Sequence, residues 1–258
     1  MKVRLVFRLF ALFSVLTLSA FADAQIDAWI AKARAALGSD SALDAVWSVH
    51  FKGTLETTQQ VPSKADPKVM TTVPLRLGID IVFQKPYRQR IVLRSDKVVE
   101  TTALDGYDGW MRRADANKED QWQLTLLDPN QIKRLRANTW ENLSFYRGIE
   151  RLGGNIQLRG EETVDGKPCV KLLFSHADNI TFLRYFDKDT GRLVKTVTET
   201  GGEIREEGET IIDGVRYPKK LFNKTPTGDV TTITFDSIKV NENLPASEFA
   251  VPTLLPKP

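Results

Sequence analysis

Turn sequences divide the second half of this 258-residue chain at similar intervals. They are Asp165-Gly166, Asp189-Thr190-Gly191, Asp213-Gly214 and Thr227-Gly228-Asp229. Asp-Gly and related pairs favour tight loops between antiparallel strands, because glycine adopts a positive φ without steric cost. The spacing therefore predicts a long antiparallel meander. Its strands are expected at Cys169–Ser175, Ile180–Asp187, Leu193–Glu199, Glu203–Ile212, Tyr217–Asn223 and Val230–Val240.

Alternating apolar residues predict further strands in the first half of the chain. The proline-bounded polar stretch Pro62–Pro74 is expected to be a loop, and Gln121–Leu127 fits either a strand or the approach to a helix. No side-chain motif repeats with the turns, so the pattern is not that of a propeller or solenoid. The expected strands are Trp47–Thr57, Leu75–Gln84, Arg88–Arg94, Val98–Leu104 and Gly109–Arg113.

The first residues predict an export signal rather than part of the fold. A basic start precedes the apolar run Leu9–Leu18, which is too short to span a bilayer core of about 30 Å. Small residues follow it and fit a cleavage site. We expect residues 1–22 to be a signal peptide cleaved near 22–24, and residues 23–258 to form one β domain in the periplasm. An uncleaved membrane anchor is the alternative.

The net charge limits the classes of partner that the chain is expected to bind, and the cysteine content excludes an internal disulfide. The formal net charge of the whole chain is +3, and Lys2, Arg4 and Arg8 of the signal peptide supply three positive charges. The mature chain is therefore formally neutral and has no overall attraction to nucleic acid. The single cysteine, Cys169, cannot form an internal disulfide and is expected to be a small buried apolar residue.

Two segments have helical rather than strand spacing. Apolar residues from Ile26 to Leu37 form one stripe, and Ser41–Val46 predicts a further short helical turn. Asp128-Pro129 is typical of an N-cap with proline in the first turn. The segment Asn130–Tyr146 that follows is interrupted by polar residues at 138 and 139, which predicts one broken helix or two short ones.

A meander of this length twists and curls, and one of its faces must be covered to prevent aggregation. The two helical segments are the available covers. We therefore expect a mainly β (α+β) fold, in which a single curved antiparallel sheet carries helices as a lid across its concave side. Whether the interior is hollow decides what such a fold can do.

Catalytic motifs are missing from the sequence. The only histidines are His50 and His176, and no HExxH, Cys-x-x-Cys, Gly-x-Ser-x-Gly or phosphate-binding glycine run occurs. Cys169 and His176 fall on opposite faces of an unbroken strand. We predict no enzymatic activity, no cofactor and no metal site, with a hydrolase as the weakest alternative. Four carboxylates are interpreted as a solvated strand surface: Glu203, Glu206, Glu207 and Glu209.

Five motifs occur in order along the mature chain: Ala35–Leu43, Asp105–Trp110, Tyr185–Leu193, Gly214–Pro218 and Asn241–Pro252. In this order they resemble the LolA-like superfamily of outer-membrane lipoprotein-sorting proteins, with its sensor relatives of the RseB type. The resemblance implies an incomplete β-barrel whose helices close a hydrophobic cavity. It also implies residence in the periplasm and binding of acyl chains.

The resemblance makes apolar residues on the strands and the lid candidates for an acyl-binding cavity, with plain core packing as the alternative for each. Burial of methylene groups alone would hold an acyl chain, so no polar anchor is expected. The candidates are Phe83, Leu93, Trp110, Ile132, Leu135, Trp140, Leu143, Phe174, Phe182, Phe186 and Phe235.

The leading hypothesis is a periplasmic carrier that binds the acyl chains of a lipoprotein or lipid, for transport to or sorting at the outer membrane. The alternative is an envelope-stress sensor that binds a membrane-protein partner. The expected partners are a lipid or acylated lipoprotein and an inner-membrane exporter or regulator. Peripheral contact with a membrane is a further hypothesis, in which Lys133, Arg134 and Arg136 approach anionic headgroups. A solvated helix face is the alternative for these three residues.

Overall fold

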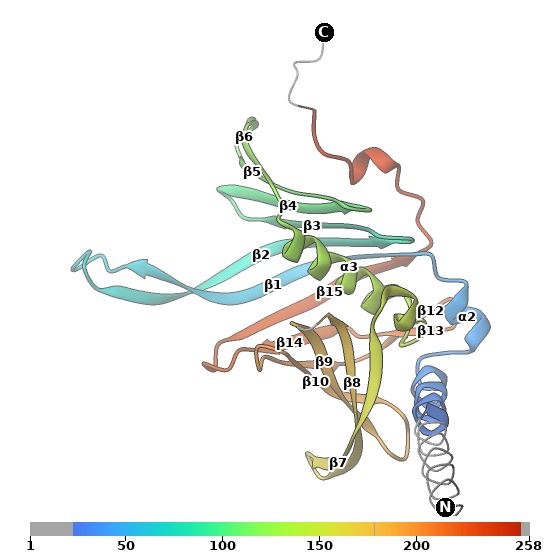
Figure 1. The fold of residues 1–258 in the computed structure, drawn as a ribbon. Coiled ribbons are helices and arrows are strands. Elements are labelled where there is room, and N and C mark those ends of the chain that lie inside the picture. The colour runs from blue at the N-terminus through green and yellow to red at the C-terminus, as the bar shows by residue number, and fades with distance from the viewer. Residues whose placement is uncertain (1–22, 178, 254–258) are drawn as a thin grey trace, which may run out of the picture.

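The computed structural model describes residues 23–177 and 179–253, so the expected signal peptide lies outside the described residues. Thirteen strands form one antiparallel sheet in the order β6-β5-β4-β3-β2-β1-β15-β14-β11-β10-β9-β8-β7 (Figure 1). Because β6 and β7 are edges, the curved sheet is not closed into a barrel, and the expected fold class is confirmed. The strands are β1 (Ser48–Pro62), β2 (Met70–Gln84), β3 (Arg88–Arg94), β4 (Val98–Asp105), β5 (Asp108–Asp115), β6 (Lys118–Leu126), β7 (Asn155–Val164), β8 (Lys167–Ala177), β9 (Ile180–Asp187), β10 (Leu193–Thr198), β11 (Glu203–Glu207), β14 (Lys220–Lys224) and β15 (Val230–Val240).

The sheet consists of two meanders that β14 and β15 join. Strands β1 to β6 follow one another as neighbours, as do β7 to β11, and β15 pairs with both β1 and β14. The β1–β15 pairing contains a register shift beside Gly53. A Cβ atom at Gly53 would lie 1.9 Å from the carbonyl oxygen of Thr234, so only glycine allows this close approach.

The helical elements lie outside the sheet. Residues 23–35 are helical, and α2 (Asp40–Asp44) follows at the position where a short helical turn is predicted. The other elements outside the main sheet are α3 (Pro129–Leu143), the 3₁₀ turns η1 (Ile149–Leu152) and η2 (Ala246–Glu248), and a two-stranded sheet of β12 (Thr210–Ile212) with β13 (Val215–Tyr217). Among the described helices, none has the length and apolar character needed to span a lipid bilayer.

The helix α3, here called the lid helix, crosses the concave face and packs against β1 to β5 (Figure 1). Asp128 caps its first turn, and the side chain of Gln131 returns a hydrogen bond to the Asp128 backbone, which completes a capping box. The expectation of a broken helix is wrong. The hydroxyl of Thr139 donates to the carbonyl of Leu135 (3.0 Å), so this residue is accommodated inside the helix, and Asn138 lines a cavity.

The strands differ from the expectations in three further places. The loop expected over Pro62–Pro74 is limited to residues 63–69, because β1 and β2 form a longer hairpin. Pro74 is tolerated there because β2 pairs with β3 only from Gly78 onward, so β2 has a single neighbour at the proline. The polar edge strand β7 was not among the expected strands. The expected strand Glu203–Ile212 is interrupted at Gly208, whose φ is +66°.

Two apolar clusters fill much of the concave side. In the first, Ile30 and Ala33 of the N-terminal helix pack with Trp140 of the lid helix against β8 and β9. In the second, Leu43 and Val46 pack with the end of the lid helix against β1 and β2. Both segments expected as covers therefore lie against the sheet.

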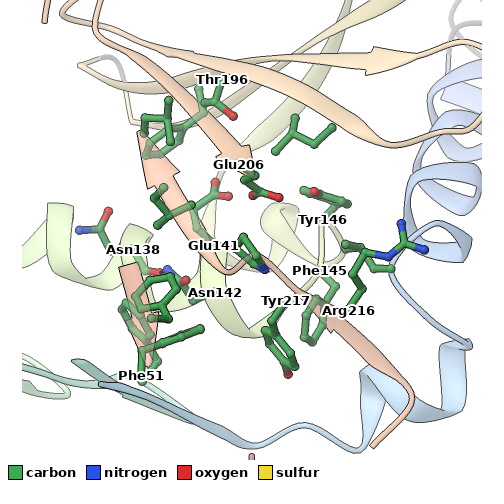
Figure 2. A pocket seen from close by; sticks show the side chains of 18 of the residues that line it. Phe51, Asn138, Glu141, Asn142, Phe145, Tyr146, Thr196, Glu206, Arg216 and Tyr217 are labelled. Atoms are coloured by element: carbon green, nitrogen blue, oxygen red, sulfur yellow. Dashed lines mark hydrogen bonds between the residues drawn. The ribbon is translucent and has the colours of Figure 1, made fainter. Parts of the chain in front are cut away.

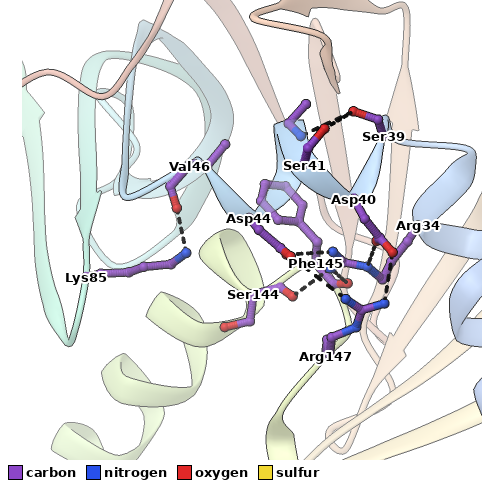
Figure 3. A network of polar contacts seen from close by, with 11 residues as sticks. Arg34, Ser39, Asp40, Ser41, Asp44, Val46, Lys85, Ser144, Phe145 and Arg147 are labelled. Atoms are coloured by element: carbon purple, nitrogen blue, oxygen red, sulfur yellow. Dashed lines mark hydrogen bonds and ion pairs between the residues drawn. The ribbon is translucent and has the colours of Figure 1, made fainter.

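A buried arginine ties the N-terminal helix to the loop after the lid helix (Figure 3). Arg34 is 1% exposed, and its Nη1 donates to the carbonyl of Phe145 at 3.0 Å. Its Nε and Nη2 pair with Asp40 at 2.7 Å and Asp44 at 2.8 Å. Each nitrogen of the guanidinium thus has a hydrogen-bond partner, as a buried charge requires.

The C-terminal segment covers the opposite, convex face. Trp110 Nε1 donates to the carbonyl of Phe249 at 2.8 Å, and Arg90 pairs with Glu248. Closer to the centre of the sheet, both ring nitrogens of His50 face carboxylates, Nδ1 at 2.5 Å from Glu242 and Nε2 at 3.1 Å from Asp80. A ring that donates from both nitrogens is protonated.

The His50 cluster makes stability depend on pH. The hydrogen bond to Asp80 raises the pKa of His50 against the effect of burial, with Glu242 contributing in the same direction. Burial opposes ionisation of Asp80, but His50 and Arg90 outweigh it and lower the pKa of Asp80 to about 2. The stabilisation from His50 is therefore complete below its unfolded pKa near 6.5 and is lost as the pH rises through the raised folded value.

We predict that His50→Gln lowers the free energy of unfolding by about 1–3 kcal/mol at pH 6 and by clearly less at pH 9, because only the charged ring makes the lost interactions. Urea titration of both proteins at the two pH values measures this. An equal loss at both values would contradict the charged assignment.

Candidate ligand cavity

A partly open cavity of about 320 Å³ lies on the concave side, between the lid helix and strands of both meanders (Figure 2). Its volume is at the small end of the range for pockets that hold small ligands. The concave side is therefore not packed solid. Apolar residues form most of the wall: Leu37, Phe51, Ile81, Phe83, Phe145, Tyr146, Phe182, Leu193, Ile204, Tyr217, Pro218, Leu221 and Phe235.

Strand pairing and the alternation of side chains place the residues of the cavity wall on one face of the sheet. Arg184 of β9 lies opposite Thr196 of β10, which lies opposite Ile204 of β11, and all three line the cavity. Two residues further along β11, Glu206 lies opposite Leu221 of β14 and also lines it. Because side chains of alternate residues share a face, Ile204 and Glu206 point to the same side of β11.

A buried ionic group lies in the wall between the lid helix and β8–β9. Glu141 receives a hydrogen bond from Arg184 and lies 2.6 Å from Nε2 of His176. The side chains of all three are at most 8% exposed. Burial disfavours the Glu141 carboxylate, but Arg184 and His176 reverse this and lower its pKa. The lid helix is thus joined to the sheet by a charged contact within an apolar surrounding.

Aromatic rings enclose the guanidinium of Arg184. Its Cζ lies 4.4 Å from the ring centre of Phe174 and 5.1 Å from that of Tyr146. Nε and Nη1 have no hydrogen-bond partner among the described residues and face these rings instead of water. Cation–π attraction offsets part of the cost of leaving those donors unpaired.

Glu206 projects into the cavity. Figure 2 shows it between Thr196, Glu141 and Tyr146. Its side chain is exposed to the solvent-accessible space of the partly open cavity. The surrounding protein nevertheless raises the pKa of Glu206, which the Arg184 charge partly opposes. Glu206 is solvent-accessible, as expected for a solvated strand surface, but it faces the cavity on the concave side of the sheet.

The cavity continues toward the end of the N-terminal helix. A second hollow of about 360 Å³ has a more polar wall that includes Arg192 and Glu209. The two hollows share Leu37, Tyr146, Leu193, Glu206, Gly208 and Arg216. Glu206 thus stands where the apolar cavity meets the more polar hollow.

The structure distributes the eleven sequence candidates over several places. Phe83, Phe182 and Phe235 line the cavity together. Trp140, Leu143, Phe174 and Phe186 are buried in the clusters behind the wall, and Leu93 packs against one of them. Leu135 lines a separate hollow under the start of the lid helix, and Ile132 packs beside Gly109. Trp110 lies on the convex face, where the C-terminal segment covers it.

Sequence reasoning missed the polar residues of the cavity. One signal was available, since alternation places Arg184 on the same face as Phe182 and Phe186, and a charge on an apolar face needs a buried partner. The partner, Glu141, is 43 residues away along the chain and could not be paired with Arg184 from the sequence. Among the described residues, no group of three or more His, Cys, Asp or Glu side chains could hold a metal ion.

Several solved structures share the fold over nearly the whole chain at low identity. A LolA-superfamily protein from Nitrosomonas europaea has a TM-score of 0.56 and 13% identity, covering 87% of this chain and 97% of that one. A putative outer-membrane lipoprotein-sorting protein domain from Vibrio parahaemolyticus has a TM-score of 0.51 and 11% identity, covering 85% and 94%. A DUF1329-family protein from Desulfovibrio piger has a TM-score of 0.52 and 14% identity, covering 87% and 96%.

No protein-family description and no curated protein matches the sequence. The structural likeness shows that the chain has the LolA-like fold, which confirms the fold that the resemblance in the sequence implied.

We predict that Glu141→Gln lowers the free energy of unfolding by about 3–5 kcal/mol, because it leaves the Arg184 charge buried without a carboxylate. Chemical denaturation monitored by tryptophan fluorescence measures the loss. Glu162→Gln is the matched control, since it breaks an exposed pair with Lys171 and should change stability by at most about 1 kcal/mol. Similar small losses for both variants would show that the Glu141 contact contributes little.

Proposed function

We propose that this protein is a periplasmic carrier that binds an acyl chain of a lipid or lipoprotein in its concave cavity. The observation that carries the proposal is the unfilled, mostly apolar space under the lid helix. The signal peptide expected at residues 1–22 would deliver the chain to the periplasm. The LolA-like fold, which this chain shares with a lipoprotein-sorting protein domain, supports the same proposal.

The wall of the cavity suits an alkyl chain on energetic grounds. Each methylene group moved from water into an apolar site contributes about 0.8 kcal/mol. Phe51, Ile81, Ile204 and Leu221 offer such surfaces from four different strands. A cavity at the small end of the ligand-binding range fits one chain better than several.

The lid helix is placed to control access. It is held to the sheet by the Glu141 contacts and, after its last turn, by Arg34 through the carbonyl of Phe145. The segment that follows contains Gly148 and Gly153, both at positive φ, which flank η1. Movement of the lid helix about this segment would widen the cavity for loading and release.

Both arginines of the lid helix already have contacts within the chain. Arg134 pairs with Glu199, and Arg136 donates to the carbonyl of Gly106 while stacking on Tyr87 and Tyr107. We therefore expect delivery to depend more on a membrane-protein or receptor partner than on direct attraction of these arginines to anionic headgroups.

The hydrolase alternative is disfavoured by geometry. It requires a histidine that activates a nucleophile. His50 lies on the convex face with both ring nitrogens against carboxylates, whereas His176 lies against Glu141 on the concave side. The two histidines are thus on opposite faces of the sheet and cannot share a site.

We predict that a fluorescent acyl probe binds the mature protein and that unlabelled alkyl ligands displace it with affinity rising about fourfold per methylene, from about 8 carbons until the cavity is full. Leu221→Trp, which fills the cavity, should weaken binding about tenfold or more. Lys220→Trp on the same strand points to the other face and should bind normally. Failure of every acyl ligand to displace the probe, or equal effects of the two variants, would overturn the proposed function.

A further inference from the structure

Glu206 differs from the other glutamates of its region. Glu203 pairs with Arg205, Glu207 approaches Lys220, and Glu209 pairs with Arg216. For Glu206, no hydrogen bond or ion pair is found within the described residues, although it lies in the wall of the cavity.

The two arginines of the cavity wall each have a carboxylate partner other than Glu206. Arg184 donates to Glu141 and is held between aromatic rings, and Nε of Arg216 lies 3.2 Å from Glu209. The Glu206 carboxyl in this largely apolar wall therefore has only water to bond to, and a ligand that displaces the water must supply a donor to avoid leaving the carboxyl unpaired.

The position of Glu206 suits contact with the head of an amphiphile. The carboxyl lies where the apolar cavity meets the more polar hollow lined by Arg192 and Glu209. An alkyl chain that extends from this point toward Phe51 and Leu221 would leave its polar end beside Glu206. Chain and head would then each meet surfaces of matching polarity.

We propose that Glu206 binds the hydrogen-bond-donating head of an amphiphile, an ammonium or hydroxyl group, while the cavity holds its alkyl chain. This inference rests on the proposed function and names the class of ligand. A carboxylate head would be disfavoured, because it would lie beside Glu206 and near the ionised Glu141, and the arginines of the wall already have the carboxylates of Glu141 and Glu209 as partners. Burial also raises the pKa of Glu206, and a protonated or ionised carboxyl accepts a hydrogen bond in either form.

The test uses three ligands of equal alkyl length, with amine, hydroxyl and carboxylate heads, in the probe-displacement assay near pH 7. The mature wild-type protein should bind the amine at least about tenfold more tightly than the carboxylate. Glu206→Gln should reduce that ratio to about twofold or less and retain the hydroxyl ligand, whereas Glu206→Leu should weaken both donor heads. Glu207→Gln, on the opposite face of β11, should preserve the wild-type order.

The outcomes separate this inference from the proposed function. If all three ligands bind with length-dependent affinity but Glu206→Gln leaves their order unchanged, or if the wild type prefers the carboxylate, the role of Glu206 is overturned and the carrier survives. If none of the three binds, the proposed function itself fails. Thermal melting of each variant shows whether it is folded. Glu206→Leu and Glu206→Gln provide two independent measurements of how residue 206 affects binding.

Discussion

The concave face of an open sheet is the constraint on which the rest of this structure depends. Thirteen strands that do not close would expose a wide apolar surface, and the helices of the described part of the chain cover it only partly. Arg34 links these covers, because its guanidinium joins the N-terminal helix to the end of the lid helix. The cover is incomplete, and the space left beneath it is the cavity.

Charged side chains interact more strongly inside this apolar region than they would in water. Glu141 pairs with Arg184 and contacts His176, which joins the lid helix to the sheet, so opening of the lid would disrupt an ionic contact as well as apolar packing. Glu206 is outside this group and faces the space where a ligand would lie. Under the proposed function, the surroundings that would hold an alkyl chain would also make this single carboxyl group a strong determinant of which head can accompany the chain.

Much of the fold could be predicted because its signals are local. Asp-Gly turns and alternation gave most strands, and β3, β9 and β15 begin and end where they are expected. The site was harder to predict, since its members meet only through strand pairing and lid placement. Phe83, Phe182 and Phe235 could be selected as apolar strand residues, but Trp110 has the same sequence character and lies on the other face. Which face of the sheet a side chain occupies depends on the strand register, and the register could not be derived from the sequence.

The central claim is that the cavity holds an acyl chain in the cell. Native mass spectrometry of the protein isolated from periplasm without detergent tests it most directly, with the denatured protein as the reference mass. We expect an additional mass that is lost on denaturation and that fragmentation identifies as an alkyl- or acyl-containing molecule. A protein that carries no such molecule as isolated, and takes none up from a total lipid extract of the same cells, would contradict the account.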